Sequence, residues 1–301
     1  MKILISGASG FVGKNIIEYL QRFVGVEIQT ISLREDGWED FDFDGYDAII
    51  HLAGKAHDTA NTSEPKSYFE INRDLTIKLF EKFKYSNVND FIFFSSVKSV
   101  ADSVEGILDE TIIPNPKTAY GKSKLEAEHY LISSELAKDK RVFVLRPCMI
   151  HGPGNKGNLN LLYSVVEKGI SWPLASFDNQ RSFLSVENLS FLVHEILKNR
   201  TLKSNIYNLA DDDFISTNEL VSLISNILGK KTRLLKINSA LIRYVAKLGD
   251  FLPFPLNSER LKKLTESYRV SNLKIKEDLH LKNLPISTID GLRITIESFK
   301  K

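Results

Sequence analysis

Short unbroken apolar runs alternate with helical spacings along this chain. Residues 2–6 form one such run and predict a buried strand, and the apolar residues of 14–23 then recur at the spacing of one helix face. The alternation continues and predicts strands at 26–33, 47–52, 90–96 and 141–146, with helices at 65–84 and 118–137. Residues 34–46 are too short and acidic for a normal crossover helix. Apolar strands separated by helices indicate a parallel sheet covered on both faces.

The pattern changes after Pro147. A glycine-rich loop at 151–158 is followed by a predicted strand at 181–184, a helix at 186–197 and another sheet strand at 205–209. Short helices and a few strands fill the rest. We therefore expect an α/β fold: a Rossmann-type doubly wound parallel sheet with a smaller, partly interleaved C-terminal α/β substrate domain. The predicted division places 1–150 in the larger domain, to which 181–210 returns, and 151–180 with 211–301 in the smaller one.

Composition excludes several classes of function. The 301 residues carry a net charge of +2 that is spread along the chain, so we expect no nucleic-acid partner. The single cysteine, Cys148, allows neither an intrachain disulfide nor a cysteine metal cluster, and no metal site is predicted. Asp250, Pro253 and Pro255 interrupt the apolar stretch 240–256, which favours a lid, a core or a subunit contact over a membrane segment. The expected setting is the cytoplasm, with no membrane partner.

The first predicted strand runs directly into a glycine loop, Gly7-Ala8-Ser9-Gly10-Phe11-Val12-Gly13. A strand, a glycine turn and a helix in this order are typical of a dinucleotide site. Gly7 permits the tight turn, Gly10 lets the backbone approach a pyrophosphate at the helix N-terminus, and Gly13 lets the helix pack closely on the strand. The spacing is G-x-x-G-x-x-G.

Tyr120 and Lys124 lie four residues apart on a predicted helix and so share one of its faces. A phenol ordinarily has a pKa of about 10, and a nearby ammonium would lower it, so that Tyr120 could act as a general acid or base. Ser95 and Ser96 end the apolar strand at 90–96, and ligands of open α/β sheets bind beyond such strand ends. A hydroxyl there can bond the same substrate oxygen.

These pieces together resemble the extended short-chain dehydrogenases/reductases, in the NAD-dependent epimerase/dehydratase family that acts on nucleotide sugars. The matching segments cover about two thirds of the chain: G-A-S-G-F-V-G, D-A-I-I-H-L-A-G at 47–54, Asn72, F-F-S-S at 93–96, Y-G-K-S-K, L-R-P-C-M-I-H-G-P-G at 145–154, K-G-N at 156–158 and Q-R-S-F-L-S-V-E-N-L at 180–189.

The resemblance implies a role for each matching residue. The catalytic residues would be Ser96, Tyr120 and Lys124. Cofactor contacts would come from Gly7, Ser9, Gly10, Phe11, Val12, Gly13, Leu52, Ala53, Gly54, Asn72, Tyr120, Lys124 and Pro147. Substrate contacts would come from Ser96, Asn158 and Arg181, with Arg260 as a further candidate for a phosphate contact. Lys98 could reach the substrate, and His57 could contact the pocket.

Two local features bear on the reaction. Dehydratases of this group place an acidic pair after the catalytic hydroxyl, whereas Val97-Lys98 follows Ser96 here, so dehydration is not expected. At the end of the second strand, Ser32 and Arg34 stand where an NAD-binding acid is usual, and they suit the 2′-phosphate of NADP. Glu35 and Asp36 lie just beyond, so NAD remains the alternative.

We therefore expect an enzyme that uses NADP(H) to reduce a 4-keto nucleotide-diphosphate sugar, in bacterial surface-polysaccharide synthesis. The alternatives are a UDP-hexose or N-acetylhexosamine 4-epimerase with bound NAD, and a sensor that binds cofactor without turnover. The long helices at 65–84 and 118–137 could form the four-helix contact of a homodimer common among such enzymes.

Overall fold

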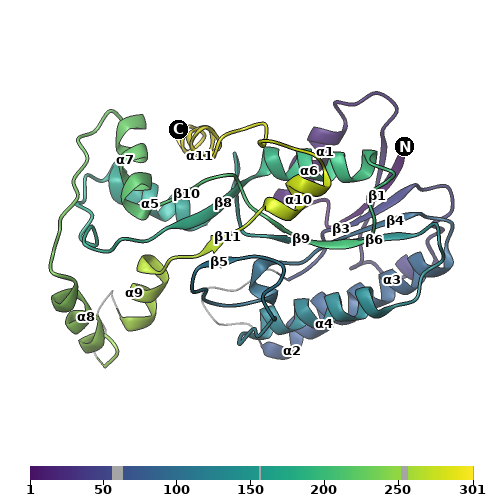
Figure 1. Cartoon of the computed structure of the whole chain (residues 1–301), viewed down its shortest axis with the longest axis horizontal. Coiled ribbons are helices and arrows are strands. Elements are labelled where there is room, and N and C mark those ends of the chain that lie inside the picture. The colour runs from purple at the N-terminus through teal and green to yellow at the C-terminus, as the bar shows by residue number, and fades with distance from the viewer. Residues whose placement is uncertain (56–63, 156, 252–256, 301) are drawn as a thin grey trace.

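A six-stranded parallel sheet forms the centre of the larger part of the molecule (Figure 1). In this computed structural model, residues 1–55, 64–155, 157–251 and 257–300 are described. The strand order is β2-β1-β3-β4-β6-β9, and each neighbouring pair is parallel. The strands are β1 (Lys2–Ser6), β2 (Glu27–Ile31), β3 (Ala48–His51), β4 (Asp90–Phe94), β6 (Arg141–Pro147) and β9 (Asn205–Leu209). The predicted Rossmann-type fold is confirmed.

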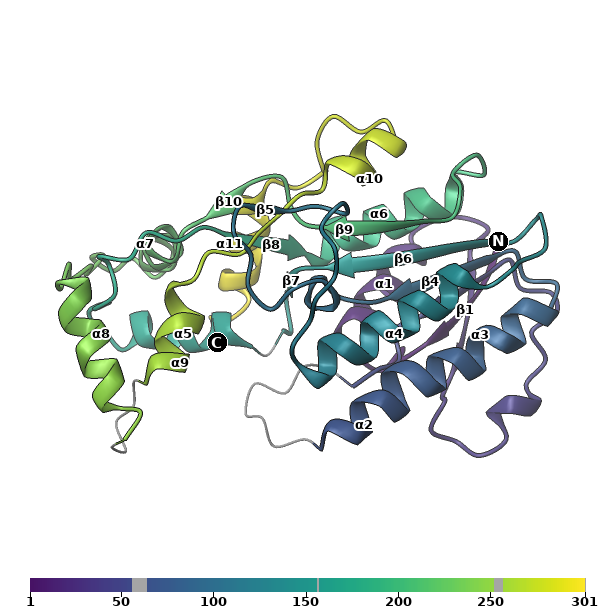
Figure 2. The same cartoon turned by 60° about the horizontal axis from the view of Figure 1, so that its bottom comes forward.

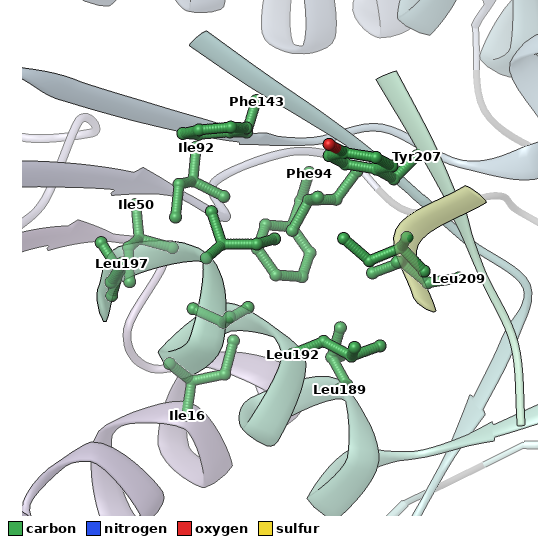
Figure 3. Close-up of a cluster of buried hydrophobic side chains, with 14 of the residues drawn as sticks. Ile16, Ile50, Ile92, Phe94, Phe143, Leu189, Leu192, Leu197, Tyr207 and Leu209 are labelled. Carbon is green, nitrogen blue, oxygen red and sulfur yellow. The ribbon is translucent and has the colours of Figure 1, made fainter. Parts of the chain in front are cut away.

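Helices cover both faces of this sheet, as its apolar strands require (Figures 1 and 2). One face packs against α1 (Phe11–Leu20) and α6 (Val186–Lys198), with Ile16, Leu189 and Leu192 filling the space beside Ile50, Ile92 and Tyr207 (Figure 3). The other face packs against α3 (Leu75–Tyr85) and α4 (Ala119–Ser133) through residues such as Phe80, Phe83 and Leu131. Because all six strands run parallel between these two helix layers, their carboxyl ends lie together at one edge of the sheet.

The helix predicted at 65–84 is interrupted by a wider turn. It consists of α2 (Pro65–Phe69), a π-helical segment at Glu70–Asp74 and α3. Such a bulge changes the direction in which the side chains of one turn point. Other bounds differ by a few residues: α1 begins at Phe11, directly after its N-cap Gly10, and α4 ends at Ser133 rather than at 137. Between β2 and β3 only a short 3-10 turn, Trp38–Asp40, is helical, as expected.

A second, smaller unit lies beyond the carboxyl edge of the sheet (Figure 1). β8 (Arg181–Ser185) pairs with β7 (Met149–His151) and β10 (Phe214–Ile215) in a three-stranded sheet. β8 does not join the six-stranded sheet, whereas β9, later in the chain, does. The remaining elements are β5 (Ile107–Leu108), β11 (Arg269–Val270), a 3-10 turn at Val97–Ser99, α5 (Asn158–Glu167), α7 (Thr217–Ile227), α8 (Ser239–Leu248), α9 (Ser258–Thr265), α10 (Leu273–Asp278) and α11 (Thr288–Glu297).

Helix α8 accounts for part of the apolar stretch at 240–256. Ile242 and Ala246 are buried in the core of the smaller unit, whereas Leu241 and Tyr244 are exposed. Residues 252–256 lie outside the described residues. None of the described helices is long and apolar enough to cross a membrane.

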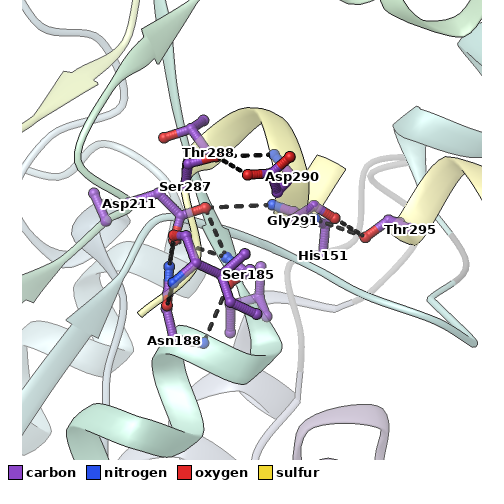
Figure 4. Close-up of polar contacts among 12 residues, drawn as sticks. His151, Ser185, Asn188, Asp211, Ser287, Thr288, Asp290, Gly291 and Thr295 are labelled. Atoms are coloured by element: carbon purple, nitrogen blue, oxygen red, sulfur yellow. Dashed lines mark hydrogen bonds and ion pairs between the residues drawn. The ribbon is translucent and has the colours of Figure 1, made fainter. Parts of the chain in front are cut away.

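A buried polar network joins the small sheet to α6 and α11 (Figure 4). The Asp211 carboxylate accepts hydrogen bonds from the backbone N–H of Ser185, at 3.0 and 3.1 Å, and from the side-chain amide of Asn188 at 2.7 Å. His151 Nδ1 lies 2.9 Å from the Thr295 hydroxyl on α11. Because the carboxylate is buried and fully engaged, it holds the start of α6 in register with the end of β9.

Candidate active site

The glycine loop lies against the end of β3. Gly7 has φ +76°, and a Cβ placed on it would lie 2.5 Å from the Ala53 nitrogen, so only glycine fits there. A Cβ on Gly13 would lie 2.6 Å from the Gly7 oxygen, which explains how α1 packs directly onto the loop. Gly10 is the N-cap of α1 and supplies no side-chain cap, so the first amides of the helix stay open. This arrangement suits a pyrophosphate.

Ser96 and Tyr120 are brought together by the two elements predicted to carry them. Ser96 lies two residues beyond the end of β4 and caps the 3-10 turn by accepting from the Lys98 amide at 3.2 Å. Its hydroxyl shares a hydrogen bond with the Tyr120 phenol. Burial raises the pKa of Tyr120, and the Ser96 hydrogen bond opposes this rise. In this state Tyr120 holds its proton at neutral pH and is a proton donor.

Lys124 lies one turn further along α4. Its ammonium donates to the Phe94 carbonyl at 2.7 Å and lies 4.8 Å from the centre of the Phe93 ring. Only 5% of the residue is exposed, and this burial lowers the pKa of Lys124 to about 8. A Cβ on Gly54 would lie 3.3 Å from the Lys124 nitrogen, so the loop after β3 passes directly over the ammonium.

Asn72, from the π-helical turn, completes this group. Its side chain accepts from the Lys55 amide at 2.7 Å and donates to the Lys55 carbonyl at 3.1 Å and the Ser123 hydroxyl at 3.2 Å. Asn72 is fully buried, so it acts on the loop through Lys55. Ser96, Tyr120, Lys124, Gly54 and Asn72 therefore converge at the carboxyl edge of the sheet, beside the glycine loop.

The other cofactor candidates lie along the same edge. Ser32 and Arg34 are exposed just past the end of β2, and in the described part of the chain no ion pair holds the Arg34 guanidinium. Ser9 is exposed in the glycine loop, and Phe11 and Val12 are partly exposed at the start of α1. Leu52 and Ala53 are partly exposed beyond β3, and Pro147 is buried at the end of β6.

The substrate candidates are spread over the boundary between the two units. The Lys98 ammonium donates to the Asp102 carbonyl at 2.8 Å and lies 4.2 Å from the centre of the Tyr268 ring. Arg181 donates to the carbonyls of Glu266, at 3.1 Å, and Lys263, at the end of α9. Burial lowers the pKa of both Lys98 and Arg181. Arg260 lies on the exposed side of α9.

Asn158 and His57 are the remaining predicted site residues. Asn158 begins α5, but its side chain lies outside the described part of the structure. His57 lies outside the described residues altogether, as does Lys156 of the K-G-N segment.

The family model described as "NAD dependent epimerase/dehydratase family" matches residues 3–210, from β1 to the residue after β9. The chain belongs to this family.

Similar proteins include two bacterial enzymes and one solved structure. A UDP-glucose 4-epimerase of Vibrio cholerae is 29% identical over 99% of this chain and 95% of its own. A GDP-6-deoxy-D-mannose reductase of Pseudomonas aeruginosa is 26% identical over 75% of this chain and 80% of its own. The structure of RMD from Pseudomonas aeruginosa complexed with NADPH superposes with a TM-score of 0.78 at 21% identity and covers 100% of both chains. The chain is thus an enzyme of the short-chain dehydrogenase/reductase type.

Within this family fold, the structure adds polar residues that the sequence did not reveal. His51 is fully buried at the end of β3, with Nδ1 2.6 Å from the Ser6 hydroxyl and Nε2 2.9 Å from the Thr76 hydroxyl. Burial, and secondarily the Lys124 charge, lowers the pKa of His51 to about 3. The neutral ring thereby ties β1, β3 and α3 together beneath the glycine loop.

Glu128 and Arg146 form a second buried group beside Ser96 that the sequence did not reveal. One signal was available: Arg146 is a charged residue inside an otherwise apolar strand, and such a residue needs a buried partner.

Proposed function

We propose that this enzyme reduces a 4-keto nucleotide-diphosphate sugar at C4 with NADPH. The observation that carries the proposal is the hydrogen-bonded pair Ser96–Tyr120, with the Lys124 ammonium one helical turn away, at the sheet edge where the glycine loop opens. The cofactor would lie with its pyrophosphate at the N-terminus of α1 and its ribose near Gly54 and Lys124. The smaller unit, with Arg181 and Arg260, would hold the sugar nucleotide.

The chemistry requires a hydride and a proton. The bound nicotinamide would supply the hydride to C4. Tyr120 would give its proton to the C4 oxygen, and Ser96 would donate a hydrogen bond to the same oxygen, so that the carbonyl becomes a secondary alcohol. Lys124 would stabilise the phenolate that Tyr120 becomes, since a cation close to a phenolate favours it. Burial raises the pKa of Tyr120 before the reaction, which suits a proton donor.

The preference for NADPH rests on the end of β2. Ser32 and Arg34 are exposed there, and no acidic side chain occurs between Glu27 and Glu35. A guanidinium with free donors suits a 2′-phosphate. The 4-epimerase with bound NAD is the second candidate, and it is favoured by the similarity of the whole chain to the Vibrio cholerae enzyme.

Arg34→Ala provides the test of the cofactor. If Arg34 binds the 2′-phosphate, the variant should bind NADPH about 10-fold or more weakly because a charge-assisted hydrogen bond is lost, with NADH binding unchanged. Fluorescence titration of both cofactors measures this, with Arg22→Ala as the control for loss of a surface arginine. Equal weakening for both cofactors would contradict the 2′-phosphate contact, and release of stoichiometric NAD from the denatured wild type would favour the epimerase.

We further propose a cytoplasmic enzyme of surface-polysaccharide synthesis that works as a homodimer through α2, α3 and α4. Light scattering of the purified protein tests the last point, and a monomer would contradict it.

A further inference from the structure

We propose that Glu128, clamped by Arg146, is a positioning residue that sets Ser96 against Tyr120 and Lys124 for catalysis. This inference rests on the C4 chemistry proposed above, but it concerns residues that neither contact the substrate nor belong to the catalytic group. It is carried by a buried hydrogen-bond cluster directly behind Ser96.

Glu128 is deeply buried, with 1% of the residue exposed, and Arg146 is 4% exposed. The two side chains form a forked ion pair: Arg146 Nη2 lies 2.5 Å from Glu128 Oε2, and Arg146 Nε lies 3.1 Å from both carboxylate oxygens. Two buried charges of this kind are costly to desolvate, and apolar residues of similar volume often serve stability equally well. A role other than stability would explain why the pair stands here.

The Glu128 carboxylate also contacts two serine hydroxyls, one just before Ser96 in the chain and one three residues after it. Ser95 donates to Glu128 Oε1, and the Ser99 hydroxyl lies 2.6 Å from the same oxygen. The Ser99 hydroxyl also lies 2.7 Å from the Ser96 carbonyl oxygen. The single Ser99 proton can serve either of these two acceptors, and Ser95 and Ser99 together tie the chain before and after Ser96 to one carboxylate.

Glu128 also belongs to the helix face that carries the chemistry. It follows Lys124 by four residues and Tyr120 by eight, and all three side chains contact the segment 94–99 at and beyond the end of β4. Tyr120 bonds Ser96, Lys124 bonds the Phe94 carbonyl, and Glu128 bonds Ser95 and Ser99. The spacing of α4 against this turn therefore depends on Glu128 as much as on the catalytic side chains.

The charge of Glu128 acts on both titrating groups. It raises the pKa of both Lys124 and Tyr120. Burial lowers the pKa of Lys124, so the two effects oppose each other there, whereas burial raises the pKa of Tyr120, so the two effects add. The other titratable groups that act on the two are Tyr68 from α2, on Tyr120, and His51 from β3, which interacts with Lys124. Removing the carboxylate charge should therefore lower the pKa of the Tyr120 phenol. Because the phenol must carry its proton to act as the acid, activity should then be lost at a lower pH as the pH rises.

The chain offers a matched control at the opposite end of the same two strands. Asp90 and Arg141 begin β4 and β6 and form a forked pair with both bonds at 2.7 Å, and Asp90 is 1% exposed. Asp90→Asn should lower the unfolding temperature with kcat within twofold of wild type. Glu128→Gln should lower kcat at least 10-fold with KM within threefold, and should move the alkaline limb of the pH profile down by at least half a unit.

Two further measurements keep the inference testable. Ser95→Ala with Ser99→Ala leaves the ion pair intact and should fold, yet it should lower kcat at least fivefold. Ultraviolet titration of the enzyme with bound NADPH measures the pKa of the Tyr120 phenol without any substrate. Each protein is compared with its own Tyr120→Phe form, so that the difference reports Tyr120 alone. The pKa of the phenol should be lower in Glu128→Gln than in the wild type, and unchanged in Asp90→Asn.

Wild-type kcat in the double serine variant, or the same phenol pKa in Glu128→Gln and wild type, would overturn the positioning role. Absence of turnover in the wild type would instead contradict the proposed function, and the phenol titration would still test this inference.

Discussion

At the scale of single residues, the proposed site separates proton transfer from structural support. Tyr120 and Ser96 are the groups that would meet the substrate oxygen, whereas the buried His51 ties β1 and β3 to α3, and the buried Asn72 holds the loop after β3. This division predicts different consequences for loss of each kind of residue.

Tyr120→Phe should lower turnover at least 1,000-fold, since general acid catalysis contributes about 10²- to 10⁴-fold and the phenol also orients the substrate oxygen. NADPH should still bind with nearly wild-type affinity because the ring remains. Stopped-flow kinetics and cofactor titration measure the two quantities. Turnover within 10-fold of wild type would remove Tyr120 from the catalytic role.

His51 should make the fold sensitive to acid. Its pKa is lowered from 6.5 to about 3, so the unfolded chain binds a proton that the native state refuses. The stability that His51 contributes is complete above pH 6.5 and declines as the pH falls towards 3. Relative to His51→Gln, the wild type should lose about 3 kcal/mol of unfolding free energy between pH 7 and pH 4, at 1.36 kcal/mol per pKa unit. Urea unfolding at both pH values checks this, and parallel pH dependences of the two proteins would contradict it.

At the scale of elements, α4 must approach the turn after β4 unusually closely. A Cβ on Gly121 would lie 2.3 Å from the Lys98 carbonyl oxygen and 2.7 Å from Pro116 Cβ. Glycine between Tyr120 and Lys124 is therefore required by packing, although glycine weakens a helix interior.

Gly121→Ala should push α4 away from the turn and separate Tyr120 from Ser96. We expect a loss of about 1–3 kcal/mol of stability, as overpacking usually costs, together with at least a 10-fold loss of kcat. Lys122→Ala, at an exposed position of the same helix, is the control and should change neither. Thermal unfolding and steady-state kinetics measure both, and a fully active, stable Gly121→Ala protein would show that the helix has room to move.

Local sequence predicted the elements better than their ends and pairings. β1 and β9 have the predicted bounds, and in β1 a short apolar run between polar residues specifies the buried strand. The π-helical turn at Asn72 was not predictable, since it depends on contacts with Lys55 and Ser123 that are distant in sequence. The pairing of β8 with β7 and β10 likewise depends on tertiary contacts that no local pattern specifies.

The candidate site shows the same limit. The glycine loop and the Y-x-x-x-K pattern are local, and the structure brings the residues that they indicate to one edge. Glu128 and Arg146 are 18 residues apart and meet only because α4 packs on β6, so no local pattern connects them.

At the scale of the whole molecule, the sheet edge with its cofactor candidates faces the smaller unit, which carries Arg181 and Arg260 (Figure 1). The buried Asp211 carboxylate, just after β9, holds the start of α6 through Ser185 and Asn188 (Figure 4). It thereby joins the end of the small-sheet strand β8 to the larger sheet. Turnover would therefore require both units, one to hold the hydride donor and the other to hold the sugar nucleotide.

Transfer of deuterium tests this account most directly. The wild-type enzyme, incubated with a 4-keto nucleotide sugar and NADPH deuterated at the transferred position of the nicotinamide, should yield a product with one deuterium at C4 and one equivalent of NADP⁺. Mass spectrometry and NMR locate the label, and Tyr120→Phe should give almost no product. A C4 epimer formed without deuterium from added cofactor, by an enzyme that retains NAD, would contradict reduction as the reaction.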